Sequence, residues 1–126
     1  MKKVITTPNA PSPIGPYNQA ILSGNTLYTS GQIAFNPKTG LLVLDDIKME
    51  TEQVMQNLKA VLEAASMTFE HVIKTSIFIS NMDDFTLINE VYGSYFNNDT
   101  APARETVQVA RLPKDVNVEI SMIAVK

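Results

Sequence analysis

The 126-residue chain can bury one hydrophobic core but is too short to divide comfortably into two, so we expect residues 1–126 to form a single globular domain. A formal net charge of −3, with no cluster of lysines and arginines, argues against nucleic acid as a partner. The chain has no cysteine and a single histidine, which argues against a disulfide and a zinc site. It also lacks an apolar run of signal-peptide or membrane-spanning length, which argues against a membrane partner. We expect a cytoplasmic protein without metal or cofactor.

The first third of the chain predicts a loop followed by a hairpin. Four prolines between residues 6 and 16 fix the local backbone and withhold amide donors, as in an ordered loop. Two strand-like runs, Tyr17 to Leu22 and Thr26 to Ser30, flank a Ser-Gly-Asn sequence at residues 23–25. Glycine and asparagine tolerate the positive φ angles of a tight turn, so we expect a β-hairpin.

Two later segments have the apolar spacing of amphipathic helices. Residues 47–65 place one stripe of apolar side chains at helical spacing, formed by Val54, Met55, Leu58, Val61, Leu62 and Ala65. Asn81 and Asp83 are possible N-caps of a second helix, which we expect to end near Asn97 and Asn98. Its apolar residues are Phe85, Ile88, Val91, Tyr92 and Tyr95.

Three further segments predict strands. In Val72 to Ile79 the period changes to two, which places Ile73, Thr75, Ile77 and Ile79 on one face. A run around Thr106 to Val109 lies between two prolines, and Val116 to Val125 is apolar on both sides. Two helices can cover only one face of such a sheet. We therefore expect identical subunits to cover the other face in a homo-oligomer.

Four short stretches could carry chemistry: Gly15–Ala20, Ser30–Ile33, Pro102–Thr106 and Val118–Ile120. Each also has a purely structural explanation as a turn or a strand end, and none identifies a function alone. Arg104 follows a proline that could aim its guanidinium at a carboxylate, although most arginines are solvated surface residues. Glu119 lies between two apolar residues of a strand, where a carboxylate is either functional or simply faces solvent.

Taken together, these stretches resemble the reactive intermediate deaminase (RidA) family over nearly the whole chain. The matching motifs occur in family order and spacing at Gly15–Ala20, Ser30–Ile33, Thr51–Val54 with Asn57 and Leu58, Phe85 with Asn89–Tyr92, Ala101–Arg104, Val109–Asp115 and Val118–Ile120. The resemblance implies a chorismate-mutase-like α+β fold with two helices packed on one face of a mixed sheet. It also implies a homotrimer with three equivalent sites in the clefts between subunits.

The resemblance assigns roles to individual residues. Arg104 is expected to hold a substrate carboxylate, while Tyr17, Ser30, Gly31 and Glu119 line the pocket or position water. The chain departs from the pattern after the arginine, where many members have Ser and Cys but this chain has Glu105 and Thr106. Strand alternation should turn Glu105 away from Arg104 and leave Thr106 on the arginine's face, where its hydroxyl could form part of the pocket wall and alter the substrate range.

The implied activity is hydrolysis of 2-iminobutanoate or 2-iminopropanoate, including their enamine tautomers, to a 2-keto acid and ammonia. Arg104 would anchor the carboxylate and Glu119 would hold the attacking water. Two alternatives remain open: a regulatory module that binds keto acids without turnover, and a ribonuclease or translation inhibitor, a label that some relatives have carried. The acidic balance and the lack of a histidine pair make the ribonuclease the weaker alternative.

Overall fold

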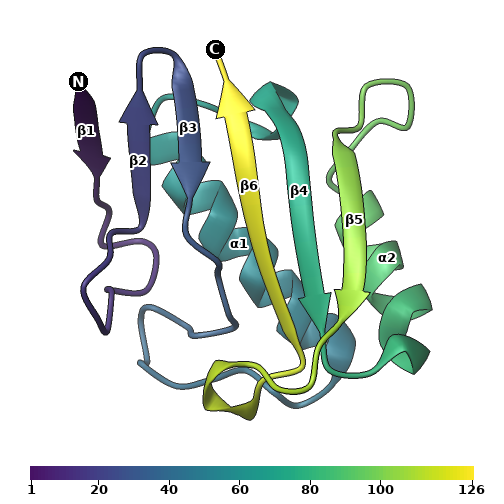
Figure 1. Cartoon of the computed structure of the whole chain (residues 1–126). Coiled ribbons are helices and arrows are strands. Elements are labelled where there is room, and N and C mark those ends of the chain that lie inside the picture. Colours follow the sequence, from purple (N-terminus) through teal and green to yellow (C-terminus); the bar gives the residue numbers. More distant parts are fainter.

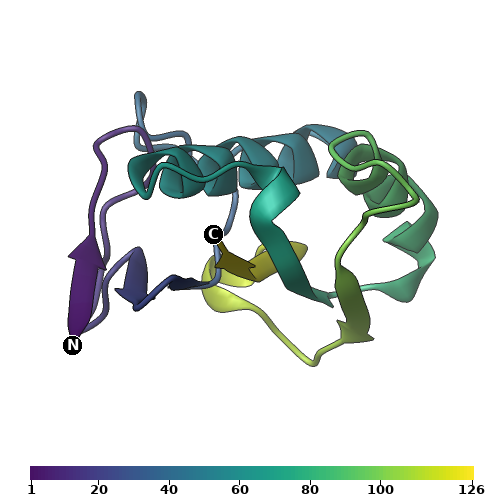
Figure 2. The same ribbon diagram turned by 90° about the horizontal axis from the view of Figure 1, so that it is seen from above.

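The computed structural model describes all residues from Met1 to Lys126 and consists of two layers, a six-stranded sheet and two helices on one of its faces (Figures 1 and 2). The elements in chain order are β1 (Lys2–Ile5), β2 (Ala20–Ser23), β3 (Thr26–Thr29), α1 (Ile47–Ala64), β4 (Val72–Ile79), α2 (Phe85–Gly93), β5 (Ala103–Gln108) and β6 (Val118–Val125). The strand order is β1-β2-β3-β6-β4-β5, and every neighbouring pair is antiparallel except β4 and β5. The expected mixed sheet with two helices on one face is confirmed.

The N-terminal part differs from the prediction in two ways. Strand β1 was not expected, because two of its four residues are lysines and the run is too short to show an alternating pattern. It forms one edge of the sheet by pairing with β2. The predicted hairpin is present around Gly24, which has a φ of +61°, but its first strand begins at Ala20 rather than Tyr17. Tyr17 and the two residues after it belong to the preceding loop.

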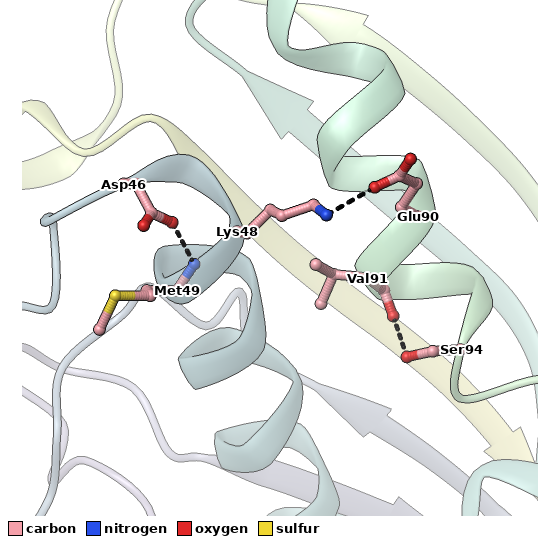
Figure 3. A network of polar contacts seen from close by, with 6 residues as sticks. All are labelled: Asp46, Lys48, Met49, Glu90, Val91 and Ser94. Atoms are coloured by element: carbon pink, nitrogen blue, oxygen red, sulfur yellow. Dashed lines mark hydrogen bonds and ion pairs between the residues drawn. The ribbon is translucent and has the colours of Figure 1, made fainter.

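Helix α1 forms because its apolar stripe packs against the sheet. The five residues of the stripe from Val54 to Leu62 are fully buried, and Ala65 lies just beyond the helix end, partly buried against the core. Figure 3 shows how the helix begins: the Asp46 carboxylate accepts a hydrogen bond from the Met49 N–H at 2.8 Å. In the same view, Lys48 reaches Glu90 on α2 at 2.8 Å and links the two helices. This pair is exposed, so the link is a weak one.

Helix α2 is shorter than predicted. Asn81 caps a short 3-10 turn by accepting a hydrogen bond from the Asp83 N–H, and the α-helix itself begins at Phe85. It ends at Gly93, four residues before the predicted end at Asn97. The Ser94 hydroxyl donates to the carbonyl of Val91 at 2.6 Å (Figure 3), and such a local bond competes with the continuation of a helix.

The predicted face of β4 contains one error. Thr75, Ile77 and Ile79 are buried beneath the helices as expected, but Ile73 is 52% exposed. The register against β6 shifts between Val72 and Lys74, so that Val72 takes the buried position. The extra residue of this bulge turns Ile73 to the opposite face, because side chains alternate along a strand.

Strand β6 separates the two faces of the sheet. Its core residues are Val118, Ile120, Met122 and Ala124, which are all buried beneath the helices. Its alternate residues point to the face without helices, where Ile123 and Val125 are partly exposed. The apolar character on both sides, noted in the sequence, is thus split between a covered and an uncovered face. Neither helix is long and apolar enough to cross a membrane.

Asn57 connects α1 to the chain that follows β3. Its side-chain amide is buried and donates to the backbone carbonyls of Ile33 and Phe35 at 3.1 and 2.9 Å. Its oxygen accepts from the Gln53 side chain at 2.9 Å. These bonds tie the helix to two carbonyls of an irregular segment that is outside the named strands.

We therefore predict that Asn57→Ala lowers the free energy of unfolding by about 1–3 kcal/mol, because the partly buried Phe35 carbonyl loses its side-chain donor and the Ile33 carbonyl keeps only the Phe35 N–H. Lys59→Ala, at an exposed position of the same helix, is the matched control and should change stability by less than about 0.5 kcal/mol. Urea unfolding at one protein concentration measures both. Equal stabilities of the two variants would show that the Asn57 bonds contribute nothing.

Candidate functional site

Four of the predicted site residues lie together on the side of the sheet away from the helices. Tyr17, Gly31 and Glu119 line two adjoining hollows of about 80 and 350 Å³, and Ser30 lines the larger one. Ile14 and Pro113 contribute to the walls of both hollows. Because five of the six residues that line the larger hollow also line the smaller one, we treat them as one site and call it the Glu119 pocket.

The loop before β2 places Tyr17 in this pocket. Tyr17 follows a Gly15-Pro16 turn, in which its N–H donates to the carbonyl of Gly15 at 2.8 Å. The loop is held by Gln19, whose buried side-chain amide accepts from the Thr7 N–H at 2.7 Å and donates to the carbonyl of Pro11 at 2.8 Å. A single buried glutamine therefore fixes the proline-rich segment against the start of β2.

Ser30 joins this loop to the end of β3. Its hydroxyl donates to the carbonyl of Asn18 at 2.5 Å, and its N–H donates to the carbonyl of Gln19 at 2.9 Å. The hydroxyl hydrogen is thus already engaged within the chain. Ser30 can still accept a hydrogen bond from a ligand, but its first role here is to hold the pocket wall.

Glu119 enters the pocket because β6 buries the residues on either side of it. Its half-buried carboxylate lies so close to the backbone of Gly31 that a Cβ atom there would be 2.7 Å from Glu119 Oε2. Only glycine leaves room for this approach. Burial raises the pKa of the Glu119 carboxyl above its ordinary range, and no neighbouring charge contributes to the shift.

Arg104 lies elsewhere, on the helix side of the sheet. Its Nη1 donates to Asn89 Oδ1 at 2.6 Å, and its guanidinium carbon is 5.1 Å from the centroid of the Tyr92 ring and 5.7 Å from that of Phe85. All three partners belong to α2. The aromatic faces and the amide hold the guanidinium flat against the helix and leave further N–H donors available.

The sheet register shows that Arg104 and Glu119 are on opposite faces. Arg104 pairs with Thr75 of β4, which is buried beneath the helices, whereas Glu119 pairs with Phe78, which points the other way. Arg104 also lies on β5, the edge strand of the sheet. One chain therefore contains the two parts of the predicted site but does not bring them together.

The two residues after Arg104 point to opposite faces of the sheet, as strand alternation predicts. Glu105 turns to the helix-free face, where its carboxylate contacts Lys74 and Ser76. Lys74 first, and Ser76 after it, lower the pKa of the Glu105 carboxyl. Thr106 stays on the face of Arg104. Its hydroxyl oxygen is buried and has no hydrogen-bond partner in the chain.

Some residues around the two parts were not predicted as site residues. No site role was expected for Pro113 or Ile14, which line the Glu119 pocket, or for Asn89, which contacts Arg104. Asn89 lies four residues after Phe85 and three before Tyr92, so helical spacing already puts the three on one face. What the sequence did not show is that β5 lies beneath that face. No group of three or more His, Cys, Asp or Glu side chains is arranged to hold a metal ion.

Comparison with known proteins places the chain in one family. The family described as Endoribonuclease L-PSP matches residues 7–126. A RutC family protein of Pyrococcus horikoshii is 54% identical over 126 residues, covering 100% of this chain and 99% of the relative. The protein named 2-iminobutanoate/2-iminopropanoate deaminase in Escherichia coli K12 is 47% identical over 128 residues, covering 100% of this chain and 99% of the relative.

The fold agrees with this relationship. The crystal structure of RidA from an Antarctic Psychrobacter superposes with a TM-score of 0.94 at 40% identity, covering 98% of this chain and 99% of that one. The similarity thus extends over the sheet, both helices and the loops that form the Glu119 pocket. The chain belongs to the Endoribonuclease L-PSP family, which is the reactive intermediate deaminase family that its motifs resemble.

Proposed function

We propose that the protein hydrolyses small 2-imino acids, in particular 2-iminobutanoate and 2-iminopropanoate and their enamine tautomers, to 2-keto acids and ammonia. The observation that carries this proposal is the Glu119 carboxylate, which is half-buried against Gly31 in an open pocket and has a raised pKa. A raised pKa brings a carboxylate closer to the range in which it both accepts and returns a proton. The 47% identity to a protein named for this reaction supports the assignment.

Arg104 supplies the anchor for the substrate in this proposal. A 2-imino acid carries a carboxylate, and a guanidinium matches that group with two parallel hydrogen bonds. Asn89 occupies one N–H of Arg104, and the rings of Phe85 and Tyr92 fix its plane. The free donors would then face a carboxylate in one orientation.

The separation of Arg104 from Glu119 requires a second subunit. We propose that each site combines Arg104 of one chain with the Glu119 pocket of a neighbouring chain, in a homotrimer with three such sites. The edge position of β5 would present Arg104 to the neighbour, and the helix-free face with Ile123 and Val125 offers apolar surface to cover. Thr106, two residues after Arg104 on the same face, would lie beside the anchored carboxylate.

The chemistry then needs only acid–base help. Water attacks C2 of the protonated imine while the Glu119 carboxylate accepts a proton from that water. The carbinolamine formed in this step receives a proton on nitrogen and its C–N bond breaks. Ammonia leaves, and the C2 hydroxyl gives up its remaining proton to solvent as its oxygen becomes the keto group. Glu119 can return its proton during this second step. Tyr17 and Ser30 bound the space in which the water and the amino group would lie.

Two alternative functions make different predictions. A regulatory module would bind the keto acid at the same residues but would not accelerate imine hydrolysis. The family description also names an endoribonuclease. Against that activity is the position of His71, the one histidine. Its Nδ1 accepts from the Thr68 N–H at 2.9 Å in a capping box, and it does not line the Glu119 pocket.

We predict a trimer in solution. Light scattering coupled to size-exclusion chromatography should give about three chain masses at micromolar concentration, because closed assemblies cover apolar sheet faces of this kind. A monodisperse monomer that still hydrolyses the imine would contradict the site shared between subunits.

We predict that Arg104→Lys loses nearly as much activity as Arg104→Ala. Lysine keeps the charge but lacks the planar pair of donors, and a hydrogen bond to a charged group is worth about 1.5–3 kcal/mol, so kcat/KM should fall roughly 10- to 100-fold in both variants. The assay generates the imine with a threonine or serine dehydratase and follows the appearance of the keto acid. Near-normal kcat/KM for a folded Arg104→Lys protein would show that orientation by the guanidinium is not needed.

We predict that Glu119→Gln retains keto-acid binding but loses about 10²- to 10⁴-fold in kcat, because glutamine keeps the size of the side chain and cannot accept the proton. In the unsubstituted protein, kcat should rise as Glu119 deprotonates, so the acid limb of its pH profile lies above the ordinary carboxyl range. Calorimetry with the keto acid, on the same preparation, separates binding from turnover. An unchanged kcat would make Glu119 a structural residue.

A further inference from the structure

Glu50 is a completely buried carboxylate near the start of α1. A buried charge is stable only when polar partners replace its lost water. The ion pairs of the structure do not include this residue. Its partners are instead donors on the segment that leads into β6.

Both carboxylate oxygens of Glu50 are used. Oε2 accepts from the backbone N–H of Asn117 at 2.7 Å and from that of Val118 at 3.2 Å, and Oε1 accepts from the Asn117 side-chain amide at 2.8 Å. Hydrogen bonds to an ionised acceptor are the stronger kind. Three donors on two adjacent residues therefore fix both the position and the direction of the chain at this point.

These donors lack a partner in the sheet. Ile120 exchanges two backbone hydrogen bonds with Gln32, at 2.8 and 3.1 Å, on the β3 side of β6. Alternate residues of an antiparallel strand direct their N–H groups to the same neighbour, so the N–H of Val118 also points to that side. Glu50 stands there in place of a strand and accepts the bond that a strand would accept.

The segment held by Glu50 separates two walls of the Glu119 pocket. Before it lies the short helical turn Pro113–Asp115, in which Lys114 and Asp115 have positive φ angles of 59° and 56°. After it comes Glu119, whose carboxylate takes part in none of the ion pairs of the chain and lies against the backbone of Gly31. The place of Glu119 therefore depends on its backbone and on the contact with Gly31.

We propose that Glu50 is a positioning residue, which fixes the start of β6 and thereby holds the Glu119 carboxylate against Gly31. Its catalytic consequence rests on the proposed imine hydrolysis. The placement of Glu119 can be measured without that reaction. A failure of the positioning role of Glu50 can therefore be told from a failure of the proposed imine hydrolysis.

The test compares Glu50→Gln with Thr51→Val. Glutamine keeps the size of Glu50 but replaces one of its two acceptor oxygens with an NH₂ group, so that at least one of the three donors loses its acceptor. Thr51 is equally buried on the same helix, and its hydroxyl donates to the carbonyl of Ile47 at 2.7 Å, within the helix rather than to β6. The control therefore removes a buried hydrogen bond and leaves the pocket segment in place.

The first readout is the pH dependence of imine hydrolysis. In Glu50→Gln we expect kcat to fall about tenfold through misplacement of the base, with KM changed by less than about twofold. The acid limb of kcat should also move to lower pH, because a Glu119 carboxyl that leaves its half-buried place returns toward its ordinary pKa. Thr51→Val should keep the limb of the unsubstituted protein. If Glu50 had a purely structural role, the substitution would lower the amount of active protein but would leave the acid limb of the kcat pH profile in place.

The second readout is the titration of the Glu119 carboxyl by ¹³C NMR, with its signal assigned by comparison with Glu119→Gln. We expect a lower pKa for Glu119 in Glu50→Gln than in the unsubstituted protein or in Thr51→Val. If Glu50→Gln does not fold, Asn117→Ala removes one of the three bonds and should shift the same pKa in the same direction. An unchanged Glu119 pKa in the folded variant overturns the proposal, whether or not the protein hydrolyses imines.

Discussion

The alternation of side chains along β6 is the constraint on which the candidate site depends. Val118 and Ile120 are buried beneath the helices, so the residue between them must face the other side of the sheet. That residue is Glu119, and the absence of a side chain at Gly31 lets its carboxylate lie against the backbone. The hydrophobic core thus places a polar group in a half-buried position, and burial raises its pKa. Packing and chemistry are coupled at this one strand.

The same sheet keeps Arg104 apart from Glu119. Arg104 lies on the edge strand and contacts α2, whereas the Glu119 pocket opens on the helix-free face. A substrate small enough to be an imino acid cannot bridge the two faces of one sheet. If both residues act on one molecule, the site has to form between chains. The uncovered apolar face of β6 and the split site therefore lead to the same proposal of a closed homo-oligomer.

Much of the fold could be predicted from the sequence, because its signals are local. The stripe of α1, the alternation of β6 and the Gly24 turn each follow from spacing and residue type within a few positions. Strand β1 and the bulge before Thr75 could not be predicted, because both depend on pairing with a strand that is distant in the sequence. In the site, motifs marked Arg104 and Glu119, yet the register that puts them on opposite faces is a property of the whole sheet. The contact of Asn89 with Arg104 depends in the same way on where α2 packs.

If each site takes Arg104 from one subunit and Glu119 from another, two inactive variants should complement each other in a mixed trimer. Arg104→Ala and Glu119→Gln chains are mixed in equal amounts under denaturing conditions, refolded together and assayed for imine hydrolysis. Random assembly of a cyclic trimer then gives roughly a quarter of the sites both intact residues, and the mixture should recover roughly a quarter of the unsubstituted activity. Activity that stays at the level of the separate variants, in a refolded trimer, would contradict a site shared between subunits.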